Sequence, residues 1–187
     1  MPKTLSGPAW VAKFPTSTST DDLVEPFQSN VKKFIAALKK AGATVSISAT
    51  RRPPERAYLM HWSFKIAAGL DPAAVPAKPG VDIEWVHRDS KGNKNGPASK
   101  TAADLMVAGY DIAFEPALVS RHIEGKAIDM DVSWTAAELT ITNGAGTDVT
   151  IKTGVKNGDN TELHKVGASY HVMKLVADHP HWSSDGH

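Results

Sequence analysis

Two short stretches, far apart in the chain, carry residue types that bind metal ions. Residues 120–131 contain His122 and Asp129, and residues 178–182 contain His181. Zinc in a hydrolase is usually held by three protein ligands, with a fourth position left to water. Imidazole and carboxylate both suit this ion. We therefore predict that His122, Asp129 and His181 bind one zinc ion per chain.

The second stretch adds an acidic residue that could act on a metal-bound water. Asp178 precedes His181 by three residues. Zinc lowers the pKa of its bound water to about 7. A carboxylate beside that water can take its proton and pass it to a leaving amine. Asp178 is therefore the predicted general base of a hydrolytic reaction.

The elements around the first stretch are predicted to place Asp129 on a strand. Gly125 allows a sharp turn, and residues 126–132 then alternate between two faces. Asp129 and Asp131 share one face, and apolar residues occupy the other. A half-buried carboxylate is unfavourable unless a positive group meets it, and a metal ion would be such a group. Asp131 is expected either to support the site or, as a second possibility, to be the ligand itself.

A second histidine competes for the metal. His179 lies two residues before His181, but only His181 keeps the three-residue offset from Asp178 and is followed by an aromatic residue, Trp182. The other histidines are not expected to bind the metal. His61, His87, His164 and His171 are expected to pack or to face solvent, and the terminal His187 is expected to be disordered.

Together the two stretches resemble a family of zinc peptidases that cut peptidoglycan stem peptides. These are the D-alanyl-D-alanine carboxypeptidases and L-alanyl-D-glutamate endopeptidases, whose fold is shared with the amino-terminal domain of hedgehog proteins. The family signature is S-x-H-x-x-G-x-A-x-D, followed later by an acid three residues before a histidine and an aromatic. It is matched here by Ser120, His122, Gly125, Ala127, Asp129, Asp178, His181 and Trp182. The resemblance spans residues 44–183. Lys126 departs from it where the family usually has an apolar residue, and Asp178 stands where many members have Glu.

The resemblance also implies two residues that meet the substrate. The family element S-G-Y-R is matched in part by residues 48–51, at Ser48 and Arg51. It implies that Arg51 is catalytic and stabilises the oxyanion, although Arg52 is an alternative. Ser120 is expected to form a hydrogen bond with the substrate.

The implied function is zinc-dependent hydrolysis of a peptide bond in the stem peptides, in cell-wall lysis or remodelling. The cleaved bond is left open between the carboxypeptidase and endopeptidase types. The alternative is a non-enzymatic zinc-binding interaction domain of the same fold. Asp178 and Arg51 favour the enzyme, because a structural zinc site needs neither.

Composition limits the remaining classes. The chain has 187 residues, a net charge of +1, 41% hydrophobic and 22% charged residues, and no cysteine. A nucleic-acid binder is usually strongly basic, and no apolar run approaches the roughly 20 residues of a membrane span. Cysteine-ligated zinc and disulfides are excluded. The first residues lack the apolar core of a secretory signal. A monomer that reaches the cell wall or periplasm through lysis or a specialised secretion route is therefore expected.

The predicted fold is α+β, with helices packed on a small, mainly antiparallel sheet. An irregular segment over residues 1–20 precedes a single zinc peptidase domain over 21–187. Helices are predicted from residue 27 to the stop at Gly42 and over 54–68, 99–108 and 169–177. Strands are predicted over 44–49, 81–86 and 126–134, and residues 138–142 and 148–152 form a hairpin at the sheet edge.

Overall fold

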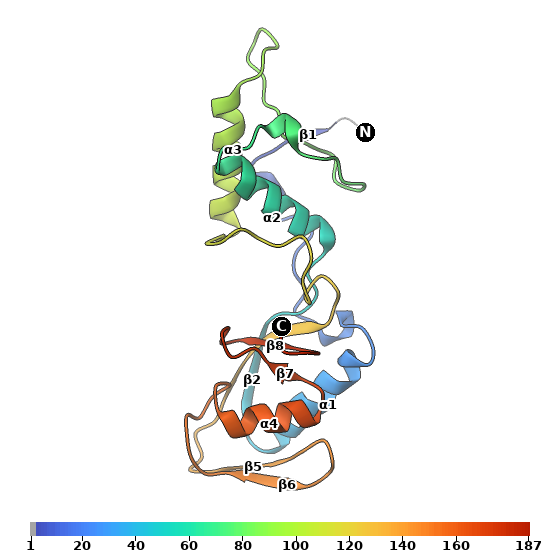
Figure 1. Cartoon of the computed structure of the whole chain (residues 1–187), viewed down its shortest axis with the longest axis vertical. Coiled ribbons are helices and arrows are strands. Elements are labelled where there is room, and N and C mark those ends of the chain that lie inside the picture. The colour runs from blue at the N-terminus through green and yellow to red at the C-terminus, as the bar shows by residue number, and fades with distance from the viewer. Residues whose placement is uncertain (1–2) are drawn as a thin grey trace. The chain divides into compact units, whose positions relative to one another are not determined.

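The fold is α+β, as the sequence predicts, in a computed structural model that describes residues 3–187. Contacts divide the chain into two compact units (Figure 1). One combines the N-terminal residues through Pro15 with Pro53–Val119, and the other combines Thr16–Arg52 with Ser120–His187. The N-terminal residues 3–15 pack with the segment that follows Pro53, and the chain then returns at Ser120 to complete the other unit.

The unit that contains the predicted metal ligands is built on a four-stranded antiparallel sheet. Its strands are β2 (Thr44–Ala49), β4 (Ala127–Ser133), β8 (His181–Ser183) and β7 (Met173–Lys174), in the order β2-β4-β8-β7. The alternation predicted along β4 is confirmed. Ile128, Met130 and Val132 are buried, whereas Asp129 is half-buried and Asp131 is exposed. One face of β4 therefore builds the core and the other carries the carboxylates.

Helix α1 (Phe27–Lys40) covers the apolar face of this sheet. Its buried stripe is Phe27, Val31, Phe34, Ile35 and Leu38, at the helical spacing predicted from the sequence. Lys39 and Lys40 lie in the last turn, where positive charge meets the partial negative charge of the helix end. Gly42 follows with φ of 91°, a conformation that favours glycine.

The predicted helix over residues 169–177 is wrong. Helix α4 occupies Thr161–Ser169 instead, where the Asn160 side chain caps it by accepting from the backbone N–H groups of Glu162 and Leu163. The helix ends before His171, which has φ of 58°. The apolar residues after this point lie in or beside β7 and in the turn that follows it, not in a helix. Val176, for example, is exposed instead of contributing to a core stripe.

The predicted hairpin is confirmed as β5 (Leu139–Thr142) and β6 (Asp148–Ile151), but it forms a two-stranded sheet of its own. It does not extend the edge of the four-stranded sheet, and its buried side chains, Leu139, Ile141 and Ile151, pack into the same core as α1 and α4. The short 3-10 turn η2 (Thr20–Asp22) also belongs to this unit.

The other unit has a separate apolar core. Its elements are β1 (Thr4–Leu5), η1 (Pro8–Trp10), α2 (Pro54–Ala67), η3 (Pro72–Ala74), β3 (Ile83–Glu84) and α3 (Gly96–Gly109). Strand β1 pairs in parallel with β3, which is shorter than the predicted strand over 81–86. Helix α3 begins three residues earlier than predicted because Asn95 caps it. Large buried side chains include Trp10, Tyr58, Leu59, Ile66, Trp85 and Met106.

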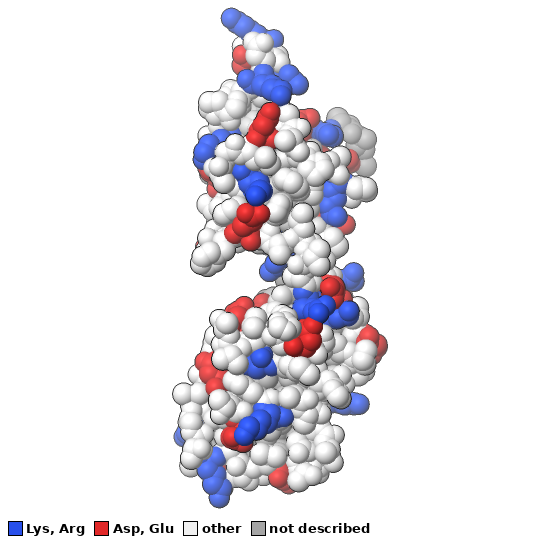
Figure 2. Space-filling view, in the orientation of Figure 1, with Lys and Arg blue, Asp and Glu red and all other residues white. Residues whose placement is uncertain are grey.

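Charges of both signs are interspersed on the visible face of each unit, as the net charge of +1 suggests (Figure 2). Over residues 3–187, none of the helices has the length and apolar character needed to cross a membrane.

Candidate metal centre

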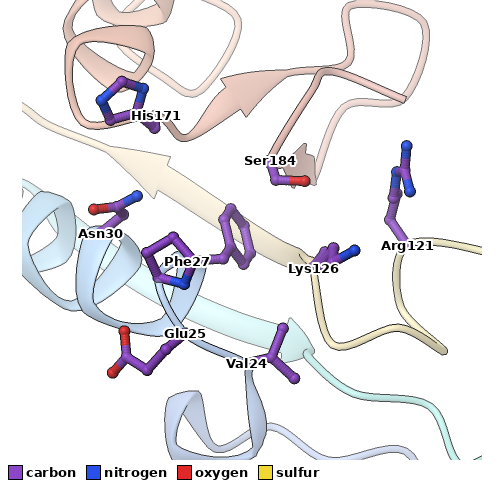
Figure 3. A pocket seen from close by; sticks show the side chains of 9 residues that line it. Val24, Glu25, Phe27, Asn30, Arg121, Lys126, His171 and Ser184 are labelled. Atoms are coloured by element: carbon purple, nitrogen blue, oxygen red, sulfur yellow. The ribbon is translucent and has the colours of Figure 1, made fainter.

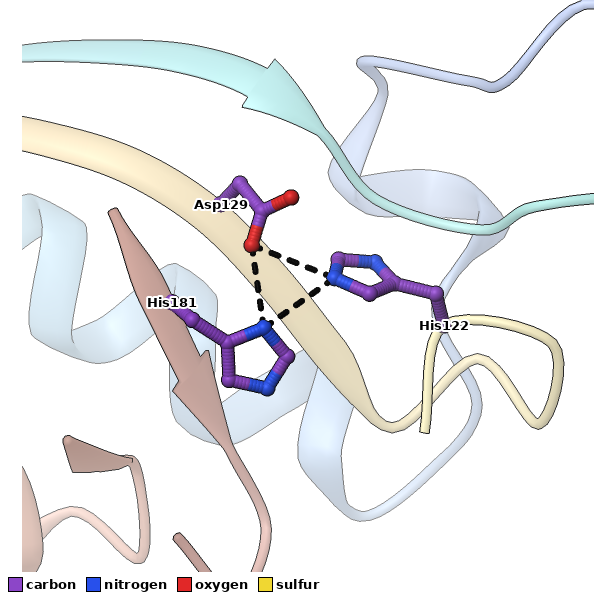
Figure 4. Close-up of side chains that lie close together, drawn as sticks. All are labelled: His122, Asp129 and His181. Carbon is purple, nitrogen blue, oxygen red and sulfur yellow. Dashed lines mark hydrogen bonds and ion pairs between the residues drawn. The ribbon is translucent and has the colours of Figure 1, made fainter. Parts of the chain in front are cut away.

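The three predicted metal ligands converge (Figure 4). His122 Nε2 and His181 Nδ1 each lie 3.1 Å from Asp129 Oδ1, and the two nitrogens are 3.2 Å apart. Both imidazoles are buried, and the carboxylate is half-buried. Residues separated by up to 59 positions therefore present one nitrogen or oxygen atom each to a common point.

Strand register and one turn create this convergence. Asp129 on β4 is the direct cross-strand partner of His181 on β8, so their side chains emerge side by side on one face. His122 comes from the turn before β4, which is closed by hydrogen bonds from Gly125 N–H to the His122 carbonyl and from Lys126 N–H to the Arg121 carbonyl. Gly125 has φ of 71°, which explains the glycine at this point of the motif.

Backbone carbonyls fix the orientation of both rings. His122 Nδ1 lies 2.6 Å from the Thr50 carbonyl oxygen, and His181 Nε2 lies 3.2 Å from the His187 carbonyl oxygen. A carbonyl oxygen only accepts hydrogen bonds, so each of these outer nitrogens donates. In a neutral imidazole the other nitrogen then carries a lone pair. The tautomers set in this way point both lone pairs toward Asp129.

Two nitrogen lone pairs and a carboxylate oxygen so close together repel one another unless a positive charge lies among them. A proton can supply that charge, and so can a metal ion. The donor set of two imidazoles and one carboxylate is one that zinc accepts. The outer hydrogen bonds to carbonyl oxygens are the kind of support that metal-binding histidines have. The cluster therefore fits a divalent metal ion and is compatible with zinc.

Protonation in the absence of metal follows from the same contacts. Burial acts to raise the pKa of Asp129, but hydrogen bonds from His122 and His181 hold it well below its usual range. Burial acts to lower the pKa of His181, but the hydrogen bond and charge of Asp129 raise it above the usual value. Asp129 is therefore ionised, and a proton on His181 competes with a metal ion for the same nitrogen.

The structure separates the predicted ligands from their competitors. Asp131 is exposed, and its carboxylate lies 3.5 Å from His179 Nε2. His179 Nδ1 in turn lies 2.6 Å from Asp159 Oδ2. The cluster therefore contains Asp129 and His181, and the two alternatives pair with each other beside it.

The remaining predicted site residues lie in the same unit. Asp178 is exposed in the turn before His181, and its charge contributes to the raised pKa of that histidine. Arg51 is exposed just after β2, whereas the backbone N–H of Arg52 donates to the His122 carbonyl. Ser120 Oγ accepts a hydrogen bond from Ile123 N–H within the turn. Roles for Asp178, Arg51 and Ser120 in catalysis or substrate binding stay predictions.

Sequence reasoning missed three groups that support the cluster. Two are the backbone carbonyls of Thr50 and His187, which a residue of any type at those positions could provide. The third is Lys174, a buried lysine in β7. Lys174 falls within the helix predicted over residues 169–177, and that prediction did not indicate that its side chain points inward. No local motif marks this lysine either.

A cavity of about 590 Å³ adjoins the turn that holds His122. Figure 3 shows the side chains that line it: Val24, Glu25, Pro26, Phe27, Asn30, Arg121, Lys126, His171 and Ser184. Glu124 pairs with Arg121 at 2.8 Å and with Lys126 at 3.2 Å, and Asp185 also pairs with Arg121. The cations lining the cavity are thus already partnered, and the cavity adds no ligand to the metal cluster.

Comparison of the chain with protein-family models, with curated proteins and with solved structures finds no match.

Proposed function

We propose that this protein is a zinc-dependent hydrolase that cleaves a peptide bond in bacterial peptidoglycan stem peptides, with the hedgehog-type fold of the peptidases it resembles. The observation that carries the proposal is the convergence of His122, Asp129 and His181 on one point. These are the residues that the motif resemblance implies as zinc ligands. The outer hydrogen bonds that leave His122 Nε2 and His181 Nδ1 free to ligate add to this support.

Each role in the proposed reaction is given to a residue of this unit. A bound zinc ion would polarise the scissile carbonyl and lower the pKa of water. Asp178 accepts the proton of the attacking water and returns it to the leaving amine. Arg51 stabilises negative charge that develops on the carbonyl oxygen. Ser120 forms a hydrogen bond with the substrate.

The substrate class rests on the resemblance of the two motifs. The proposed partner is a peptidoglycan stem peptide, met in the cell wall or periplasm. The cleaved bond is of the D,D-carboxypeptidase or the L-alanyl-D-glutamate endopeptidase type. The Asp at position 178 is more like the endolysin members of the family than the dipeptidases.

The proposal is tested by mass spectrometry of purified muropeptides after incubation with the zinc-loaded protein. Loss of terminal D-alanine, or cleavage between L-alanine and D-glutamate, is expected, and a chelator should abolish it. Asp178→Asn should retain zinc and lose at least about a hundredfold in rate, as expected for a general base. Asp148→Asn, which changes an exposed carboxylate on the hairpin strand β6, is the matched control.

Two outcomes would contradict this function. A wild-type protein that binds zinc but leaves every muropeptide intact would favour the non-enzymatic zinc-binding domain. Full activity of Asp178→Asn with zinc bound would show that another group moves the proton.

A further inference from the structure

A buried lysine lies beneath the loop that carries the proposed base and one metal ligand. Residues 175–180, called the β7–β8 loop here, connect Lys174 at the end of β7 to His181 at the start of β8. Lys174 Nζ lies 2.6 Å from the Leu175 carbonyl oxygen, 2.5 Å from that of Asp178 and 3.3 Å from that of His181. One side chain therefore contacts the beginning, the middle and the end of the connection.

The chemistry of these contacts requires a charged lysine. An ammonium group has three N–H donors and no acceptor, which matches three carbonyl oxygens. Lysine is rarely buried unless paired, yet Lys174 is only 9% exposed. Burial lowers its pKa, and the nearby charges of Asp159, Asp178 and Asp129 oppose that effect. The Trp182 ring, with its centroid 5.7 Å from Nζ, gives further support.

The backbone of the loop closes around this ammonium group. Leu175 N–H donates to the His181 carbonyl, Asp178 N–H to the Leu175 carbonyl and His181 N–H to the Asp178 carbonyl. The same three carbonyl oxygens that accept from Lys174 thus also accept from the loop's own backbone. Residues 176–179 are exposed, so an apolar core does not hold the loop in place.

We propose that Lys174 is a positioning residue that fixes Asp178 and His181 relative to each other. Its ammonium group holds the carbonyl of each, so the two side chains are carried on one rigid turn. The role of the turn in presenting Asp178 rests on the proposed function, whereas its role in presenting His181 to a metal ion does not. Because its donors are occupied by carbonyl oxygens, Lys174 acts through these two residues rather than on the substrate.

The test compares Lys174→Met with the wild type and with Lys165→Met. Methionine keeps most of the side-chain volume against Trp182 and removes the three donors. Lys165 lies on α4 with its side chain 73% exposed and pairs only with Glu162 among the contacts described, so it is the matched control. The readouts are amide hydrogen exchange of the metal-free protein, zinc affinity by competition with a chromogenic chelator, and the visible spectrum of the cobalt-loaded protein.

In Lys174→Met, the Asp178 and His181 amides should exchange at least about tenfold faster. Zinc affinity should fall about 10–100-fold, as for other groups that orient a metal ligand. The cobalt spectrum should change, which a general loss of stability would not cause in the folded fraction. Lys165→Met should match the wild type in all three. Unchanged exchange, affinity and spectrum in Lys174→Met would overturn the proposal.

Two further measurements separate other outcomes. If Lys174→Met does not fold, amide hydrogen exchange of Asp178 and His181 in the wild-type protein tests the proposal instead. Asp178 and His181 amides as slow as those of β4 support the proposal, and amides as fast as those of the hairpin turn at 143–146 overturn it. In an active enzyme, Lys174→Met should lower kcat more than it raises KM. If the wild type binds zinc without hydrolysing muropeptides, the proposed function fails while the exchange and zinc readouts still test Lys174.

Discussion

Asp129 and His181 are direct partners on the neighbouring antiparallel strands β4 and β8, and Asp129 Oδ1 lies 3.1 Å from His181 Nδ1. The pair lies on the face of the sheet that points away from the core. The next cross-strand pair, Ile128 and Trp182, points to the other face and is buried in the core. One strand register therefore places the metal cluster on one face and the core on the other. A register shift of one residue would destroy both.

The choice of Asp129 over Asp131 predicts different effects of two similar substitutions. Asp129→Asn retains the shape of the side chain but removes its charge from between the two imidazoles. Zinc affinity should fall by more than the roughly 10–100-fold seen when a supporting group is lost. Asp131→Asn changes an exposed carboxylate on the same strand face and should alter zinc affinity less than about threefold. Isothermal titration of both variants checks this, and the reverse order would identify Asp131 as the ligand.

The raised pKa of His181 predicts opposite effects of pH on the metal-free and zinc-loaded protein. A group whose pKa is higher in the folded state stabilises that state below its unfolded pKa of about 6.5, and this contribution is lost as pH rises through the folded pKa. The lowered pKa of Asp129 acts only in acid, because its contribution is lost as pH falls below about 3.8. Above pH 6 the His181 effect therefore dominates this cluster.

Zinc reverses the direction because it binds deprotonated His181, so its affinity rises with pH. Melting temperatures measured from pH 6 to pH 9, with chelator and with excess zinc, should diverge as pH rises. The difference between the two curves removes the contribution of groups that do not contact the metal. Parallel curves would show that zinc binding displaces no proton from His181.

Helix α4 predicts an unfavourable effect of a substitution that usually stabilises a helix. Alanine is preferred over glycine in a helix interior by about 1 kcal/mol. A Cβ atom added at Gly167 would lie 2.7 Å from both the Trp182 ring and the Val172 carbonyl oxygen. Gly167→Ala should therefore reduce the free energy of unfolding by about 1–3 kcal/mol.

The matched control is Gly96→Ala at the start of α3, where an added Cβ has no neighbour within 4 Å. It should be neutral or slightly stabilising in urea unfolding. If Gly167→Ala is also stabilising, the close approach of α4 to Trp182 is incorrect.

The hydrogen bonds of Ser183 predict that this residue affects zinc affinity indirectly. Its Oγ accepts hydrogen bonds from the N–H groups of Gly186 and His187, and the His187 carbonyl accepts from His181 Nε2. Ser183→Ala should release that carbonyl and lower zinc affinity by about tenfold, as for other supporting groups. Ser184→Ala, one residue along, should leave zinc affinity unchanged. Equal affinities for the two variants would indicate that the His187 contact does not orient the ring.

Much of the site could be predicted from the sequence because the ligands occupy a motif with fixed spacing. The alternation along β4 indicated which face Asp129 takes, and the offset between Asp178 and His181 indicated which histidine joins it. The supporting groups could not be predicted in this way. The Thr50 carbonyl reaches His122 only through the path of the chain after β2, and backbone oxygens leave no signal in residue type.

The fold was predicted least well where short elements meet. Val172, Leu175 and Val176 have helical spacing, yet a two-residue strand and a turn occupy this stretch. In the structure the helix lies before this stretch, where the Asn160 side chain caps its first turn. The division into two units depends on residues 3–15 packing with the segment that begins at Pro53, which periodicity alone does not encode.

The most direct test of the metal centre is anomalous diffraction at the zinc edge from crystals of the zinc-loaded protein. We predict one ion per chain, bound by His122 Nε2, an Asp129 carboxylate oxygen and His181 Nδ1. An ion bound elsewhere, or these three side chains directed to separate places while zinc is present, would contradict the account.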